Sequence, residues 1–69
     1  MSTAKVIQII SNSSTSFDDA LEQGIADAAK SVHGISGAKI TDWTVDVQVN
    51  KITQYKVTLE VAFEVDASS

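Results

Sequence analysis

The side chains that could do chemistry are few in this sequence, and they favour binding over catalysis. There is no Cys, one His at position 33, and only three Gly, at positions 24, 34 and 37. Three scattered glycines cannot form a phosphate-binding loop, and no Ser stands in the nucleophile motif of hydrolases. His33 lies near the expected end of a helix, where a polar residue needs no catalytic explanation. We therefore predict that the chain is not an enzyme.

Carboxylates form the second group of reactive side chains. Those in strand-like segments are Asp42, Asp46, Glu60 and Glu64. Carboxylate oxygens are suitable ligands for a hard cation such as calcium. No loop has the spacing of an EF-hand, and one chain supplies too few ligands. The sequence thus predicts no metal site within one chain, and a divalent cation would have to be shared between copies.

Two further side chains each carry two open interpretations. Trp43 is the only Trp, and it is either a platform on which a ligand ring stacks or a packing residue at a subunit contact, where Trp is enriched. Lys56 either binds a ligand phosphate or forms a cross-strand ion pair of small energetic weight. The acidic candidates for that pair are Asp42, Asp46 and Glu60.

One helix is predicted between residues 16 and 34. Ser16 is the expected N-cap, with its hydroxyl accepting from the backbone N–H of Asp19. Gly34 is the expected residue of left-handed conformation beyond the helix end. Spacings of three and four define one apolar stripe. Its members are Phe17, Leu21, Ile25, Ala28 and Val32.

Three strands are predicted around that helix, at residues 6–10, 38–47 and in a long third segment of roughly 14 residues. Asn50 falls where a hairpin turn is needed. In the third strand, one face carries Tyr55, Val57, Leu59, Val61, Phe63 and Val65, and the other carries Gln54, Lys56, Thr58, Glu60 and Glu64. If the second strand alternates without interruption, Gly37 and Trp43 share a face about 20 Å apart.

The predicted fold is therefore α+β, in the order β-α-β-β, with one helix packed on a three-stranded antiparallel sheet over a single domain, residues 1–69. A 69-residue chain without Cys lacks the disulfides that often stabilise such small domains. The long third strand overhangs the unit, and no Pro is present to protect an exposed edge. Both features predict self-association.

Charge and hydropathy exclude several partners. The formal net charge is −4, which argues against nucleic acid, because phosphate binding needs a basic face. It also argues against an anionic membrane surface, and no apolar run is long enough to cross a membrane. The first residues lack the pattern of a signal peptide, so we expect a cytoplasmic protein.

The sequence resembles the dodecin family from about residue 5 to residue 65. The resemblance lies in the order and spacing of short segments and not in any single motif. The matching segments are residues 5–7, 13–16, 19–20, 25–26, 29–32, 51–52 and 55–63. The resemblance implies a hollow homododecamer of cubic symmetry that holds stacked flavins in pairs near its two-fold axes.

The resemblance also locates a candidate ligand site, and here the sequence departs from the family. In flavin-binding dodecins a Trp at the start of the second strand stacks on the isoalloxazine ring, and a Gln in the third strand binds the ring edge. The Trp position corresponds to Gly37 and the Gln position to Lys56. Gln54, on the same face as Lys56, is a candidate for the missing hydrogen bond, or an ordinary exposed strand residue.

The resemblance therefore implies a dodecin-like homododecamer that binds and stores a small ligand. The first candidate is a flavin, either FMN or riboflavin, bound weakly because a stacking ring is absent at Gly37. The candidate site residues are Gly37, Trp43, Gln54 and Lys56. The alternative is a structural shell that binds ions, such as a divalent cation, and no flavin.

Overall fold

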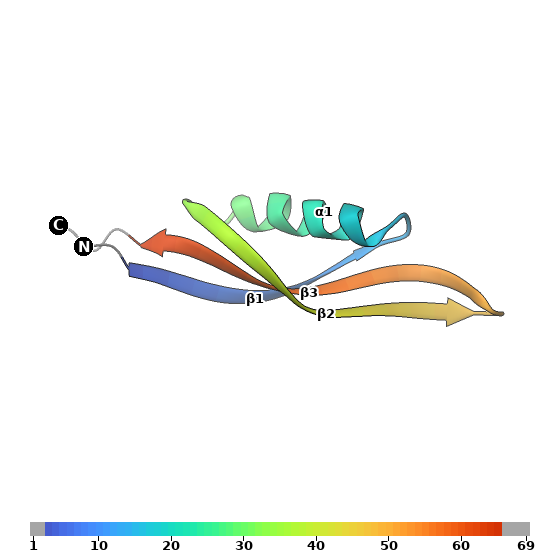
Figure 1. Cartoon of the computed structure of the whole chain (residues 1–69). Coiled ribbons are helices and arrows are strands. Elements are labelled where there is room, and N and C mark those ends of the chain that lie inside the picture. Colours follow the sequence, from blue (N-terminus) through green and yellow to red (C-terminus); the bar gives the residue numbers. More distant parts are fainter. Residues whose placement is uncertain (1–2, 66–69) are drawn as a thin grey trace.

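The computed structural model describes residues 3–65, and it confirms the predicted order β-α-β-β (Figure 1). Strand β1 spans Thr3–Ser13, helix α1 Phe17–Ala29, strand β2 Ile35–Gln48 and strand β3 Lys51–Val65. The sheet has the order β1-β3-β2, and β3 pairs antiparallel with both neighbours. Helix α1 lies along one face of the sheet (Figure 1), so the α+β architecture is as expected.

The core lies between α1 and the middle of β3. Val57, Leu59 and Val61 are fully buried, which confirms the predicted alternation in β3. The sheet face that these residues and Tyr55 share is called the helix side below. The face that carries Gln54, Lys56, Thr58 and Glu60 is called the open side.

Small residues let the helix approach the sheet closely. The buried helix residues are Ala20, Gly24 and Ala28, while Leu21 is only partly buried. A Cβ atom at Gly24 would lie 3.0 Å from Leu59 Cδ1 and 3.0 Å from Ser11 Cβ. The predicted stripe through Leu21 therefore forms a flank of the interface, and its centre is this line of small residues.

Both predicted helix ends can be compared with the structure. The Ser16 hydroxyl accepts from the Asp19 backbone N–H at 3.0 Å, as predicted. The helix ends at Ala29, earlier than the stripe through Val32 implied. The reason is that the N–H groups of Ser31 and Val32 both bond to the Ala28 carbonyl at 3.0 Å, which tightens the last turn. Gly34 has φ 75°, the left-handed conformation predicted for it.

Three irregularities interrupt the pairing of β2 with β3, between Ile35 and Gly37, Ile40 and Asp42, and Asp46 and Val47. Each leaves one extra residue, and each extra residue carries a hydroxyl that donates to a backbone carbonyl of the facing strand. The bonds are Ser36 to Ala62 at 3.5 Å, Thr41 to Thr58 at 3.2 Å, and Thr53 to Asp46 at 3.3 Å. The hydroxyls thus hold the β-bulges, which bend a strand and increase its twist.

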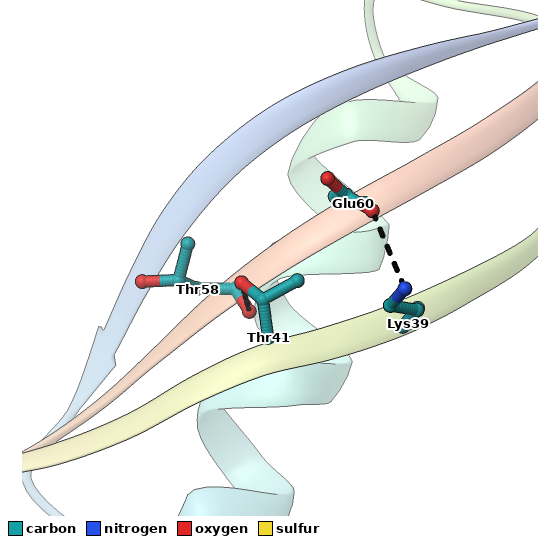
Figure 2. Close-up of polar contacts among 4 residues, drawn as sticks. All are labelled: Lys39, Thr41, Thr58 and Glu60. Atoms are coloured by element: carbon teal, nitrogen blue, oxygen red, sulfur yellow. Dashed lines mark hydrogen bonds and ion pairs between the residues drawn. The ribbon is translucent and has the colours of Figure 1, made fainter.

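The bulge at Thr41 overturns the expected alternation of the second strand. Figure 2 shows Thr41 beside Thr58, next to the Lys39–Glu60 ion pair, with α1 behind the sheet. Gly37 faces Ala62 on the open side, whereas Trp43 faces Val57 on the helix side. One extra residue between them exchanges the faces, so Gly37 and Trp43 do not share a face.

The far end of the β2–β3 hairpin extends beyond the rest of the chain. Strand β1 ends with Ser13 paired to Tyr55, so the hairpin beyond that point has only two strands. We call residues 46–54 the arm; Figure 1 shows it projecting past the start of α1. Val49 and Asn50 form its turn, with φ 51° and 62°, which confirms the hairpin turn predicted at Asn50.

Candidate functional site

An exposed aromatic cluster lies at the base of the arm. The Phe17 ring lies 5.1 Å from the Tyr55 ring, nearly perpendicular to it, and 6.5 Å from the Trp43 ring at a tilt of 52°. These geometries are typical of favourable aromatic pairs. Trp43 nevertheless remains 65% exposed. Part of the indole is therefore free to contact a ligand ring or another protein surface.

Gly37 lies on an open surface, where no other residue of the chain comes close. It is exposed, and a Cβ atom added there would meet no atom within 4 Å. A larger side chain would therefore fit without displacing a neighbour of the same chain. As the sequence comparison with flavin-binding dodecins implied, no ring from this position is available for stacking.

Gln54 and Lys56 are neighbours on the open side of β3, where the arm begins. Lys56 Nζ is 3.3 Å from Asp46 Oδ1, and Asp46 faces Gln54 in the strand pairing. The cross-strand ion pair is thus one of those predicted from the sequence. Both partners are partly exposed, so the pair contributes little, about 0–1 kcal/mol.

The four candidate site residues are not gathered within one chain. Gly37 faces Ala62, which stands six residues from Lys56 along β3, about 20 Å at the rise of a strand. Trp43 lies on the other face. A site built from all four would need several copies of the chain. The sequence interpretation also missed that Phe17 contacts both Trp43 and Tyr55, because only the register of β2 shows that these rings gather.

The four strand carboxylates all fall on the open side. Asp42 faces Thr58, Asp46 faces Gln54, and Glu60 and Glu64 follow the same alternation along β3. Two already have basic neighbours: Lys39 Nζ lies 4.0 Å from Glu60 Oε1, and Asp46 pairs with Lys56. Within residues 3–65 no three His, Asp or Glu side chains come together as a metal site.

A groove of about 430 Å³ runs between α1 and the outer strand β1. Its size falls in the range of small-molecule sites. Its lining is mixed, with apolar Ile and Ala side chains, Gly24, and polar residues of both elements. The lining residues are Ile7, Ile9, Ile10, Ser11, Asn12, Gln23, Gly24, Asp27, Ala28 and Ser31.

An exposed aromatic cluster, a polar strand face and a groove of mixed polarity are together typical of a small α+β binding subunit. The apolar side chains of the arm are exposed in the single chain. The part of the chain that the structure describes has no helix long and apolar enough to span a membrane. The model of the dodecin family matches residues 3–66. The chain therefore belongs to the dodecin family, and this membership supports a small ligand-binding protein that self-associates.

Solved structures agree with this assignment. The chain is 34% identical to the calcium-chelating immunodominant antigen, calcium dodecin, of Mycobacterium tuberculosis, with 97% of this chain and 96% of that chain covered and a TM-score of 0.80. It is 25% identical to the dodecin of Streptomyces davaonensis, with coverages of 94% and 96% and a TM-score of 0.90. The protein tt0972 of Thermus thermophilus shares the fold, at 18% identity, coverages of 99% and 100%, and a TM-score of 0.93. No curated protein sequence matches the chain.

Proposed function

We propose that this chain forms a homododecamer that binds and stores a small ligand, with a flavin or a related ring system as the first candidate. The match to the dodecin family over residues 3–66 is the observation that carries the proposal. The exposed arm supports assembly, because large apolar side chains at its surface need a cover. A cytoplasmic location remains a prediction from the sequence.

Light scattering after size exclusion tests the assembly. The mass should be near twelve times 7.3 kDa. A monomer at micromolar concentration would contradict the whole proposal. A smaller closed oligomer would contradict only the number of copies.

Flavin binding by this chain should be weak. The position of the stacking Trp is the open surface at Gly37, and ring stacking on an aromatic side chain contributes about 1–3 kcal/mol by analogy with base stacking. That difference corresponds to roughly one to two decades of affinity. The exposed indole of Trp43 is the alternative platform, on the other face of the sheet.

Titration of riboflavin and FMN, followed by the quenching of flavin fluorescence, separates these two cases. We expect binding in the micromolar range or weaker, and at least tenfold tighter binding by Gly37→Trp. If Trp43 is the platform, Trp43→Ala abolishes binding and Gly37→Trp changes little. Trp43→Phe is the matched control, because it keeps a ring and removes only the indole. Nanomolar binding that survives Trp43→Ala would contradict both sites.

A higher affinity for FMN that is lost in Lys56→Gln would support the phosphate role of Lys56. Loss of affinity for both flavins in Gln54→Ala would support Gln54 as the ring-edge donor.

A divalent cation is the second candidate ligand. The favouring observations are the 34% identity to a calcium dodecin and the four carboxylates on the open side of one chain. Oxygen ligands of this kind suit calcium, and assembly would bring together carboxylates that a single chain keeps apart.

Calorimetric titration with calcium tests this candidate on the assembled protein. We expect Asp42→Asn to remove binding more completely than Asp46→Asn, because Asp46 is already paired with Lys56. Glu22→Gln, on the exposed face of α1, is the control. No heat of binding at millimolar calcium would remove the candidate and leave the flavin proposal unaffected.

A further inference from the structure

One row of residues across the open side of the sheet is entirely apolar. Val6 of β1 faces Ala62 of β3, and Ala62 faces Gly37 of β2. We call these three residues the apolar row; it crosses all three strands and is about 10 Å wide at the usual spacing of neighbouring strands. Val6 is 58% exposed, and a Cβ atom at Gly37 would meet no atom within 4 Å. The apolar row is therefore open to a ligand.

Two carboxylates border the apolar row along β3. Glu60 and Glu64 stand two residues to either side of Ala62, and the alternation of the strand places all three on the open side. The two Glu residues are about 13 Å apart at the rise of a strand. The surface along β3 thus consists of a carboxylate, an apolar centre and a second carboxylate.

Neither of these carboxylates is firmly paired within the chain. Glu64 is exposed and forms no ion pair with another residue of the range 3–65. Glu60 Oε1 lies 4.0 Å from Lys39 Nζ (Figure 2), and the Lys39 side chain is 75% exposed. An exposed pair of this kind contributes little. The borders of the apolar row therefore repel an anion and attract a cation.

The shape and charge of this surface select one chemical class of ligand. A metal ion has no apolar body to cover the row, and Gly37 supplies no ring on which a planar ligand could stack. A linear aliphatic polyamine has methylene groups in its middle and ammonium groups towards its ends. Its methylene groups would remove apolar surface from water, and its ammonium groups would pair with the two carboxylates.

We propose that the apolar row, together with Glu60 and Glu64, binds a linear aliphatic polyamine. The methylene chain lies over Ala62 and the open space at Gly37, and one ammonium group pairs with each carboxylate. Lys39 competes with the ligand for Glu60. The proposal rests on the small-ligand function proposed above and names a ligand class for the region around Gly37.

Calorimetric titration of the assembled protein with spermidine tests the proposal. A salt concentration of about 0.15 M screens exposed charges that lie far from the ligand. Glu64→Gln should weaken binding about threefold to fivefold, because one exposed ion pair is lost. Glu22→Gln is the matched control, because it removes the same charge from the exposed face of α1. Equal losses from the two variants would mean that spermidine follows only the net charge, and would overturn the proposal.

The competition by Lys39 gives a test with the opposite sign. Lys39→Gln frees Glu60 and should tighten spermidine binding about twofold to threefold. Lys30→Gln is the control, because Lys30 also forms an exposed ion pair, with Asp27 at 3.4 Å on the helix. If both variants change the affinity by the same factor, Glu60 is not a partner of the ligand and the proposal is wrong.

A new charge placed on the apolar row tests its position. Gly37→Lys fits the open space and should weaken spermidine binding more than Asn12→Lys, which adds the same charge beside Lys56 on the open side. Equal effects would contradict the position.

The titration also separates this proposal from the proposed function. A natural protein that gives no heat with millimolar spermidine but quenches riboflavin fluorescence would reject the polyamine and leave the function standing. A monomer that binds neither compound would reject both.

Discussion

The subunit has two regions that use β2 and β3 in opposite ways. One is the arm, and the other, called the body here, is the rest of the described chain. In the body, α1 covers β3, so that Val57, Leu59 and Val61 are completely buried. In the arm the same apolar pattern continues, yet Val47 and Ile52 are half exposed or more. The alternation of apolar side chains therefore does not by itself predict that they are buried within one chain. In the body it forms a core, and in the arm it leaves apolar side chains exposed on the single chain.

The largest expected effect comes from the body. Leu59→Ala should lower the free energy of unfolding by about 2–5 kcal/mol, because it leaves a cavity under Gly24 and Ala20. Denaturation by guanidinium, followed by circular dichroism, measures the change. Val47→Ala in the arm is the matched comparison, and its loss should be smaller and should appear mainly as weaker assembly. Equal losses of folding stability from both variants would remove the distinction between body and arm.

A smaller effect is expected at the start of the helix. Ser16→Ala removes the acceptor for the Asp19 N–H and should cost about 1 kcal/mol. The same denaturation measurement applies, with exposed Ser14→Ala as the control. A cost no greater than that of the control would show that the neighbouring Ser13, which bonds to Asp19 and to two backbone N–H groups, can fix the helix start alone.

The sequence predicted the order of the elements, the N-cap, the left-handed Gly34 and the hairpin turn at Asn50, because each depends on local chemistry. It also predicted the two faces of β3, since that strand is uninterrupted over its core. It did not predict the bulges. Ser36, Thr41 and Thr53 are ordinary strand residues in composition, and their hydroxyl bonds depend on carbonyls of another strand.

The same limit applies to the site. The Lys56–Asp46 pair was within reach of sequence reasoning, because both residues lie near a predicted hairpin turn. The separation of Gly37 from Trp43 was not, because one bulge exchanges the faces of everything beyond it. How surfaces of different copies meet cannot be derived from a pattern within one chain, since it depends on the three-dimensional shape of the subunit.

The bulges offer a finer comparison of the two regions. Thr41→Val removes a hydroxyl in the body and Thr53→Val removes one in the arm, at nearly constant volume. Each lost hydrogen bond should cost about 0.5–1.5 kcal/mol. Thr41→Val should also change the fluorescence of Trp43, the only Trp, if the loosened bulge lets the indole leave Phe17. An unchanged spectrum and unchanged stability would mean that strand twist, and not the hydroxyl, holds this bulge.

The tip of the arm gives the smallest but most specific test. Val49→Asn replaces a β-branched residue at φ 51° by one that tolerates this conformation, and in an isolated hairpin it should be stabilising by up to about 1 kcal/mol. In the assembled protein we expect the reverse, because an apolar side chain that is 92% exposed in the single chain is a candidate for contact with another copy. Dissociation on dilution, followed by light scattering, should therefore occur at a higher concentration for Val49→Asn, whereas Asn50→Gly at the neighbouring turn position should behave like the natural chain. If Val49→Asn assembles as tightly as the natural chain and melts at a higher temperature, the tip is solvent-exposed in the assembly, and the strain at Val49 serves no contact.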